Sequence, residues 1–238
     1  MDDGGSLGDG LFGGHRLERH RDHMLIRLAQ PCRILSSAVL NGGLVSATYL
    51  LNMRVPENKS ADVGAHAEPE DTLEAYARGL GLAGPVVGMM TGAHMQSIQV
   101  RTACEAGVDI AIALTSGLSN ARRAGDAADA RVWFKTDLPA GTINIALVTS
   151  ATLPPAAMAE CLMIVTEAKT AALADAGVNS PVSGRPATGT GTDATAIISG
   201  GGAAVRYCGK HTRFGELAAQ AVIAALSASI AWHWRDRP

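Results

Sequence analysis

Two apolar runs separated by a turn signal constrain the fold of this 238-residue chain more than any other feature. Residues 33–40 and 44–55 are rich in β-branched and small side chains, and an Asn-Gly-Gly triplet at residues 41–43 joins them. An Asn-Gly step between two such runs is a strong hairpin signal, and a hairpin joins antiparallel strands. Residues 95–102 and 108–115 predict a second hairpin. The two hairpins favour a mostly antiparallel sheet over a doubly wound parallel one.

The remaining periodic segments complete the pattern. Further strands are expected at residues 24–28, 86–90, 142–149 and 194–199, with Pro31 ending the first of them. Helices are expected at residues 70–79, 155–176 and 212–234. We predict an α+β fold whose mixed, mostly antiparallel sheet contains hairpins and is packed by about three helices.

The first 23 residues differ in composition from the rest of the chain. Residues 1–14 are dominated by Gly and Asp, and a basic, His-rich stretch follows as far as His23. Such a segment is typical of a loose terminus, although its His-rich part also fits an edge strand. Since 47% of the chain is hydrophobic, the remainder can bury a substantial core. We predict a flexible leader at residues 1–23 and a single domain at residues 24–238.

Charge and cysteine placement narrow the class of partner. The formal net charge is −2 and the basic residues are scattered, so a nucleic-acid partner is not expected. The four cysteines are far apart without a C-x-x-C pair, and no H-E-x-x-H motif occurs, so we predict no metal site. No signal-peptide pattern is present, and the longest apolar run, residues 217–231, is shorter than the roughly 20 residues that span a membrane. We expect a cytoplasmic protein without a membrane partner.

A loop of alternating Thr and Gly at residues 188–193 ends in Asp193. Gly189, Gly191 and Ala194 have the spacing of a dinucleotide fingerprint, but that motif needs a strand before it and a helix after it, and this loop precedes a strand. Its exposed amides and hydroxyls fit a loop that approaches a ligand closely or forms an oxyanion hole. A tight turn satisfied by Asp193 fits the pattern equally well.

Three further stretches carry candidate polar residues. Lys210, His211 and Arg213 place positive charge at the start of a predicted helix, where the helix dipole disfavours it. His211 could be a general base or part of a surface cap. Residues 119–123 offer many donors for carbonyl or carboxylate groups, unless Arg122 pairs with a nearby Asp on the surface. Spacing alone favours the solvent side of a helix for Glu167 and Lys169.

Six segments in the same order resemble the adenosylcobinamide amidohydrolase family, and the resemblance covers about residues 24–230. The segments are LSSAVLNGGL at 35–44, SNARRAGD at 119–126, GTINI at 141–145, TEAKTAAL at 166–173, GRPATGTGTDA at 184–194 and GKHTRFGEL at 209–217. One departure is His94, where a small residue is expected. That departure leaves a shifted corrinoid preference open.

The resemblance implies an activity and a ligand. Members of this family hydrolyse the amide between aminopropanol and the corrin ring of adenosylcobinamide, which yields adenosylcobyric acid and 1-amino-2-propanol in cobamide salvage. The corrinoid would be the substrate, and no cofactor is expected. A corrinoid-binding module without catalysis is the alternative. The Ala-rich last helix is compatible with a homo-oligomer.

Amide hydrolysis needs an attacking oxygen, an oxyanion site and a proton for the leaving amine. Our first hypothesis is a water activated by His211 and oriented by Asp193, and the rival hypothesis makes Thr190 or Thr192 the nucleophile. The oxyanion would be held by backbone amides of residues 189–192 with Asn144 or Lys210. The predicted substrate-binding residues are Asn41, Asn120, Arg122, Arg123, Asn144, Lys169, Lys210 and Glu216.

Overall fold

The computed structural model of the chain describes residues 7–55, 68–128 and 142–235. The strands in these ranges are β1 (Leu7–Gly10), β2 (Arg16–Arg19), β3 (His23–Ser36), β4 (Gly43–Arg54), β5 (Val86–Thr91), β6 (Gln99–Glu105), β7 (Val108–Ser116), β8 (Ala121–Arg122), β9 (Ile143–Thr149), β10 (Gly189–Thr190) and β11 (Ala194–Ser199). The helices are α1 (Pro69–Gly79), α2 (Pro155–Asp175) and α3 (Arg213–Arg235), with 3₁₀ turns η1 (Phe12–Gly14) and η2 (Met95–Ser97). The three expected helices are confirmed.

One sheet carries nine of these strands. Its order is β1-β2-β3-β11-β9-β7-β6, and β4 and β5 continue from the other edge of β3. The β9–β11 and β4–β5 pairs are parallel and the other pairs are antiparallel. Strands β8 and β10 form a separate antiparallel ribbon. The predicted α+β class, with a mixed and mostly antiparallel sheet, is confirmed.

Part of the predicted leader belongs to the sheet. Strand β1 pairs with β2, and β2 pairs with the first half of β3. The anchor is Leu17, which is fully buried in the core beneath the sheet. Gly and charged residues around Leu17 hide this strand from a periodicity argument, because only one side chain in β2 is buried. Residues 1–6 lie outside the described part of the chain, and the single domain at residues 24–238 stays a prediction.

Strand β3 is longer than predicted, because Pro31 does not end it. The register of β3 on β4 shifts between Arg27 and Cys32, so the missing amide of Pro31 falls in a bulge. The predicted hairpin is confirmed, but Ser36 pairs with Gly43, and residues 37–42 form a wider connection than a two-residue turn. The second hairpin, β6–β7, does turn tightly through two residues with positive φ, Ala106 and Gly107.

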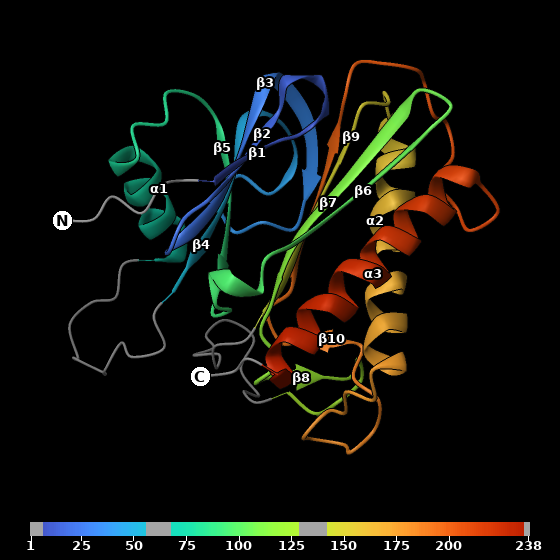
Figure 1. Ribbon diagram of the computed structural model, residues 1–238. Coiled ribbons are helices and arrows are strands. Elements are labelled where there is room, and N and C mark those ends of the chain that lie inside the picture. Colours follow the sequence, from blue (N-terminus) through green and yellow to red (C-terminus); the bar gives the residue numbers. More distant parts are fainter. Residues whose placement is uncertain (1–6, 56–67, 129–141, 236–238) are drawn as a thin grey trace.

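The sheet bends along the β3–β4 hairpin and folds over on itself. We call the inner face the side on which the two parts of the sheet pack against each other. Side chains of β4 and β5 such as Leu50 and Met89 pack on this inner face against Ala113, Ala146 and Ala196 of β7, β9 and β11. The opposite face of β7, β9 and β11 is covered by α2 and α3, while α1 covers the opposite face of β4 and β5 (Figure 1). The start of β9 therefore lies between a helical layer and the folded-over hairpin.

Helix α3 has the length and apolar composition of a membrane-crossing helix, the only such helix among the described residues. Half of its apolar window is buried inside the protein, where α3 packs on α2, β6 and β7. A core helix of a soluble domain has the same composition, so this feature is weak evidence for a membrane. Thr212 caps the helix by accepting a hydrogen bond of 3.0 Å from the Gly215 amide.

Candidate active site

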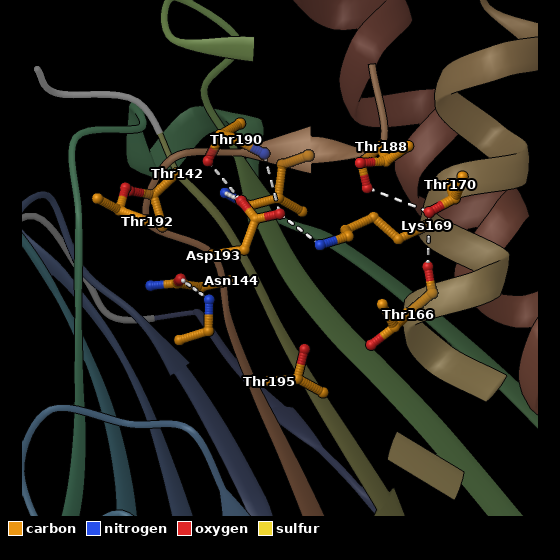
Figure 2. Close-up of polar contacts among 12 residues, drawn as sticks. Thr142, Asn144, Thr166, Lys169, Thr170, Thr188, Thr190, Thr192, Asp193 and Thr195 are labelled. Carbon is orange, nitrogen blue, oxygen red and sulfur yellow. Dashed lines mark hydrogen bonds and ion pairs between the residues drawn. The ribbon is translucent and has the colours of Figure 1, made fainter. Parts of the chain in front are cut away.

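A buried ion pair joins helix α2 to the residue that precedes strand β11. The Lys169 ammonium contacts the Asp193 carboxylate, and these side chains are only 9% and 12% exposed (Figure 2). Lys169 belongs to the buried side of α2, together with Val165 and Ala172. The interpretation that Lys169 faces solvent is therefore wrong. A buried ion pair is costly unless further hydrogen bonds satisfy both charges, so its other partners are informative.

The Asp193 carboxylate is fully occupied by donors. Besides Lys169, it accepts hydrogen bonds of 3.0 Å from the backbone amides of Ile143 and Thr190, and one from the Thr190 hydroxyl. Two carboxylate oxygens offer about four acceptor positions, so none is left for a water or for an imidazole. Asp193 is thus held by β9, α2 and its own loop, as expected for an Asp that stabilises a tight turn. It also accepts the proton of the Thr190 hydroxyl.

The Thr190 hydroxyl is oriented by this arrangement. Its proton points at Asp193, because a carboxylate can only accept. The preceding residue must be small: a Cβ on Gly189 would lie 2.4 Å from an Asp193 oxygen and 2.9 Å from the Lys169 nitrogen. Gly189 and Thr190 form strand β10, whose pairing with β8 fixes the loop in place. The Thr190 hydroxyl and the Asp193 carboxylate of this loop therefore meet the Lys169 ammonium of α2.

Thr192 and Asn144 lie on the other side of this loop and are engaged differently. The Thr192 hydroxyl lies 2.7 Å from the Thr142 hydroxyl rather than on a charged group. Both amide hydrogens of Asn144 are used, on Asn52 and on the Met90 carbonyl, each at 2.8 Å. Its side-chain oxygen accepts the Ala194 amide at 3.1 Å. The proposed oxyanion role of Asn144 therefore has no geometric support, and the residue positions the start of β11.

Sequence reasoning missed the partner that completes this network. Asn52 is fully buried on the inner face, where it accepts from Asn144 and donates to the Thr115 hydroxyl at 2.9 Å. A polar residue inside the apolar run 50–53 was an available signal, because a buried amide needs specific partners. The missed Thr142 also faces this network. No group of three or more His, Cys, Asp or Glu that could hold a metal ion occurs within the described ranges.

The predicted donor stretch lies beside the Thr-Gly loop. Asn120 is buried, and its side-chain nitrogen would lie 3.5 Å from a Cβ on Gly191. Arg122 lies in β8 opposite Gly189, and its carbonyl accepts the Thr188 amide at 2.8 Å. The Arg123 guanidinium donates to the Pro186 carbonyl at 3.0 Å, so it holds the loop rather than an open site.

Asp126 stabilises the loops beside the ribbon of β8 and β10. Its carboxylate accepts hydrogen bonds from the Ser180 hydroxyl and from the Arg123 amide. Hydrogen bonds, first from Ser180 and then from Ser183 and the Arg123 backbone, lower the pKa of Asp126 to about 2. The charge of Arg122 also lowers the pKa of Asp126, so a surface pairing of Arg122 with Asp126 stays a prediction, and the other candidate, Asp129, lies outside the described residues.

Four predicted residues do not reach the Asp193 loop. His211 is exposed at the start of α3, and Figure 1 shows that end of the helix well away from β10 and β8. Lys210 pairs with Glu167 on the surface, and Glu216 pairs with Arg213 at 2.8 Å. Asn41 donates to the Val86 carbonyl at 2.8 Å and lines a cavity of about 270 Å³ beside α1. The geometry therefore does not support a water held between His211 and Asp193.

A family model and one relative with a named activity identify the same family. The family model described as adenosylcobinamide amidohydrolase matches residues 9–237. An adenosylcobinamide amidohydrolase of Methanosarcina mazei is 29% identical over 204 residues, which cover 82% of this chain and 88% of that protein. An uncharacterized protein of Methanocaldococcus jannaschii is 45% identical over 83 residues, which cover 34% of this chain and 32% of that protein.

Solved structures show only a distant likeness. A β-aminopeptidase of Burkholderia sp. has a TM-score of 0.45 at 13% identity, over 90% of this chain and 79% of that one. A Pyrococcus horikoshii protein has a TM-score of 0.39 at 13% identity, over 97% and 82%. Both scores are too low to support an argument about the site.

Proposed function

The chain belongs to the adenosylcobinamide amidohydrolase family, and from this premise we propose that it hydrolyses the amide joining aminopropanol to the corrin ring of adenosylcobinamide. The proposed products are adenosylcobyric acid and 1-amino-2-propanol. The observation that carries the proposal is the Thr190 hydroxyl, held on the carboxylate of the buried Lys169–Asp193 pair. In this reaction the corrinoid is the substrate rather than a cofactor.

The first proposed step forms a covalent intermediate. The Thr190 oxygen attacks the carbonyl carbon of the amide while the hydroxyl proton passes to Asp193. The C–N bond then breaks, and the leaving amine takes up that proton, so aminopropanol departs as a neutral amine. An ester between Thr190 and the propionyl arm of the corrin ring remains. In the second step water attacks this ester, which restores the Thr190 hydroxyl and releases the corrin carboxylic acid.

Two groups are suited to the negative charge of the tetrahedral intermediate. An ammonium group has three donors, and among the described residues Lys169 uses only one of them, on Asp193. The Gly191 amide lies at the exposed tip of the loop and donates to no described residue. Because both donors are fixed before the substrate arrives, little reorganisation is needed as charge develops. Asn120 and Arg122 are then placed to bind amide arms of the corrin.

The test is turnover of adenosylcobinamide, followed by chromatography and mass spectrometry. We expect Thr190→Val to lower kcat by about a thousandfold or more, because it removes the nucleophile without changing the shape of the side chain. Thr190→Ser should keep part of the activity. Thr166→Val on the exposed side of α2 is the matched control and should behave like the wild type. Rapid quenching should trap an ester on the peptide that contains Thr190.

Other outcomes point to other mechanisms. If Thr190→Val keeps near wild-type kcat, Thr190 is not the nucleophile and an activated water replaces it. If Thr192→Val alone abolishes turnover, the nucleophile is Thr192. If the wild-type protein binds the corrinoid but releases no product, the chain is a corrinoid-binding module. The cytoplasmic location, the lack of nucleic-acid and membrane partners and a homo-oligomer remain predictions that this assay does not address.

A further inference from the structure

Arg54, the last residue of β4, has a guanidinium nitrogen that finds no hydrogen-bond partner among the described residues. Its Nε atom is buried and forms no hydrogen bond, and no ion pair joins Arg54 to any residue in the described ranges. A buried donor of a charged group that stays unsatisfied is unfavourable, and native structures rarely keep one without a purpose. The backbone of Arg54 is conventionally bonded, since its amide donates to the Asp22 carbonyl at 2.8 Å.

Strand alternation places the Arg54 side chain on the inner face. Met53 and Leu51 pack in the cluster beneath α1, whereas Leu50 packs on the inner face and Asn52 reaches Asn144 there. Successive side chains of a strand point to opposite faces, so Arg54 points to the same face as Asn52. The Arg54 side chain therefore lies on the side of β4 that faces strands β7 and β9.

Arg54 also lies at the end of the sheet that carries the Asp193 loop. It pairs with Thr91, which follows Met90, and the Met90 carbonyl accepts a hydrogen bond of 2.8 Å from Asn144. Asn144 in turn accepts from Ala194, the neighbour of Asp193. Two residues before Asn144 and on the same face is Thr142, whose hydroxyl meets Thr192. A long arginine side chain at this position can reach a ligand bound at the loop.

The charge at this end of the inner face is positive. The other side chains identified there, Asn52, Asn144, Thr115, Thr142 and Thr192, are neutral. The nearest carboxylate of the site, Asp193, turns toward α2 and is paired with Lys169. Asp22 is exposed and makes no ion pair with Arg54. A guanidinium that has no counter-ion among the described residues is suited to an oxyanion, most of all to phosphate.

We propose that Arg54 binds a phosphate group on the aminopropanol arm of the corrinoid, so that the preferred substrate is phosphorylated on its leaving group. This inference rests on the proposed hydrolysis. The arm ends in a hydroxyl close to the amide that is cut, so a phosphate on it would lie just beyond the Asp193 loop. Either a phosphate monoester or the phosphodiester of a complete cobamide supplies the same chemistry. Arg54 is a specificity-determining residue in this proposal, not a catalytic one.

The experiment compares three substrates: adenosylcobinamide, its phosphate monoester and a complete adenosylated cobamide. We expect wild-type kcat/KM to be about 10- to 100-fold higher for at least one phosphate-bearing substrate, because hydrogen bonds to charged groups are the strong ones. Arg54→Ala should remove this preference and leave kcat/KM for adenosylcobinamide nearly unchanged. Arg54→Lys should keep part of it. Arg33→Ala, which removes an exposed arginine on the neighbouring strand, should keep all of it. The substrate that is preferred tells a monoester from a diester.

A stability measurement separates this role from a structural one. Since the buried Nε atom of Arg54 is unsatisfied, Arg54→Met should not lower the melting temperature of the ligand-free protein. Equal wild-type kcat/KM for all three substrates, or an equal loss for all three in Arg54→Ala, overturns the inference while the proposed function stands. If none of the three is hydrolysed, the proposed function fails. Spectrophotometric titration then decides on Arg54, which is wrong if Arg54→Ala binds the phosphate-bearing corrinoids as tightly as the wild type.

Discussion

Helix α2 carries two ion pairs whose residues are only two positions apart in sequence. The Lys169–Asp193 pair has side-chain exposures of 9% and 12%, whereas the Glu167–Lys210 pair has exposures of 49% and 69%. Successive helical residues are rotated by about 100°, so residues two positions apart point in nearly opposite directions. Lys169 therefore faces the sheet while Glu167 faces solvent. The Lys169–Asp193 pair joins α2 to the loop before β11, and the Glu167–Lys210 pair joins α2 to the turn before α3.

The difference shows why local charge is a poor guide to function in this chain. Around the Glu167–Lys210 pair, positive residues at the start of α3 are neutralised by acids from elsewhere: Arg213 binds Glu105 of β6 at 2.6 Å. The pattern that marked His211 is thus a set of surface ion pairs, which contribute little and are screened by salt. The buried pair is shielded from water, and its carboxylate accepts the proton of the Thr190 hydroxyl.

The largest effect is expected from breaking the buried pair on one side. Asp193→Ala leaves the Lys169 ammonium buried without a counter-charge, which should cost about 3–5 kcal/mol of unfolding free energy. Turnover should be lost as well. The double variant Lys169→Met/Asp193→Leu removes both charges and should regain most of the stability without regaining activity. Urea unfolding and the turnover assay check both. Regained activity in the double variant would refute a catalytic role for the pair.

A buried histidine, His23, sharpens the comparison through pH. Burial, helped by the charge on His20, lowers the pKa of His23 from 6.5 to about 4, and its ring contacts the Tyr76 hydroxyl at 3.0 Å. Above pH 6.5 neither state is protonated at His23. As pH falls from 6.5 to 4 only the unfolded state takes up the proton, so stability should fall by at most about 3 kcal/mol. His23→Gln should flatten that part of the pH–stability curve, and an unchanged curve would contradict this assignment.

A smaller effect is expected when the buried pair is crowded rather than broken. Gly189→Ala would place a methyl group 2.4 Å from Asp193 and 2.9 Å from Lys169, so the loop must shift. We expect a loss of about 1–3 kcal/mol together with a fall in kcat. Gly79→Ala is the control, because a Cβ at the end of α1 meets nothing within 4 Å. It should be neutral or stabilise by up to about 1 kcal/mol. Equal behaviour of the two variants would mean that the loop adapts freely.

The smallest effect is expected at the exposed pair. Glu167→Gln should change the unfolding free energy by no more than about 0.5 kcal/mol, and less at high salt. Turnover should not change. Thermal melts at low and high salt, with the turnover assay alongside, test this. A loss of activity in Glu167→Gln would break the contrast between the two pairs and return attention to Lys210 and His211.

Much of the fold could be predicted because its signals are local. Turn residues and β-rich runs located both hairpins, and capping residues with apolar periodicity located the three helices. The misses have a local cause too: β2 buries only Leu17 strongly, and the bulge of β3 accommodates a proline that would normally end a strand. Neither strand β2 nor the bulge of β3 can be recognised from a sequence pattern, because both depend on pairing with a partner strand.

The site was predicted in part. The Thr-Gly loop with Asp193 follows from its unusual composition, and Thr190 was one of two threonines left open. Which hydroxyl contacts the carboxylate depends on the loop conformation. In the structure the Thr190 hydroxyl contacts Asp193, and the Thr192 hydroxyl contacts Thr142. Asn52 and Arg54 went unnoticed, since their importance comes from the strands that they face rather than from their neighbours in sequence.

The sequence by itself determined the family, the class of the fold and the loop that forms the candidate site, because these depend on residue order and short-range periodicity. Only the tertiary structure decided that Lys169 turns inward, that His211 stays at the surface and that Arg54 shares an inner face with Asn52. The physical reason is that charge and hydrogen-bonding groups act through distance and burial. Both are set by packing between segments that lie far apart in the chain.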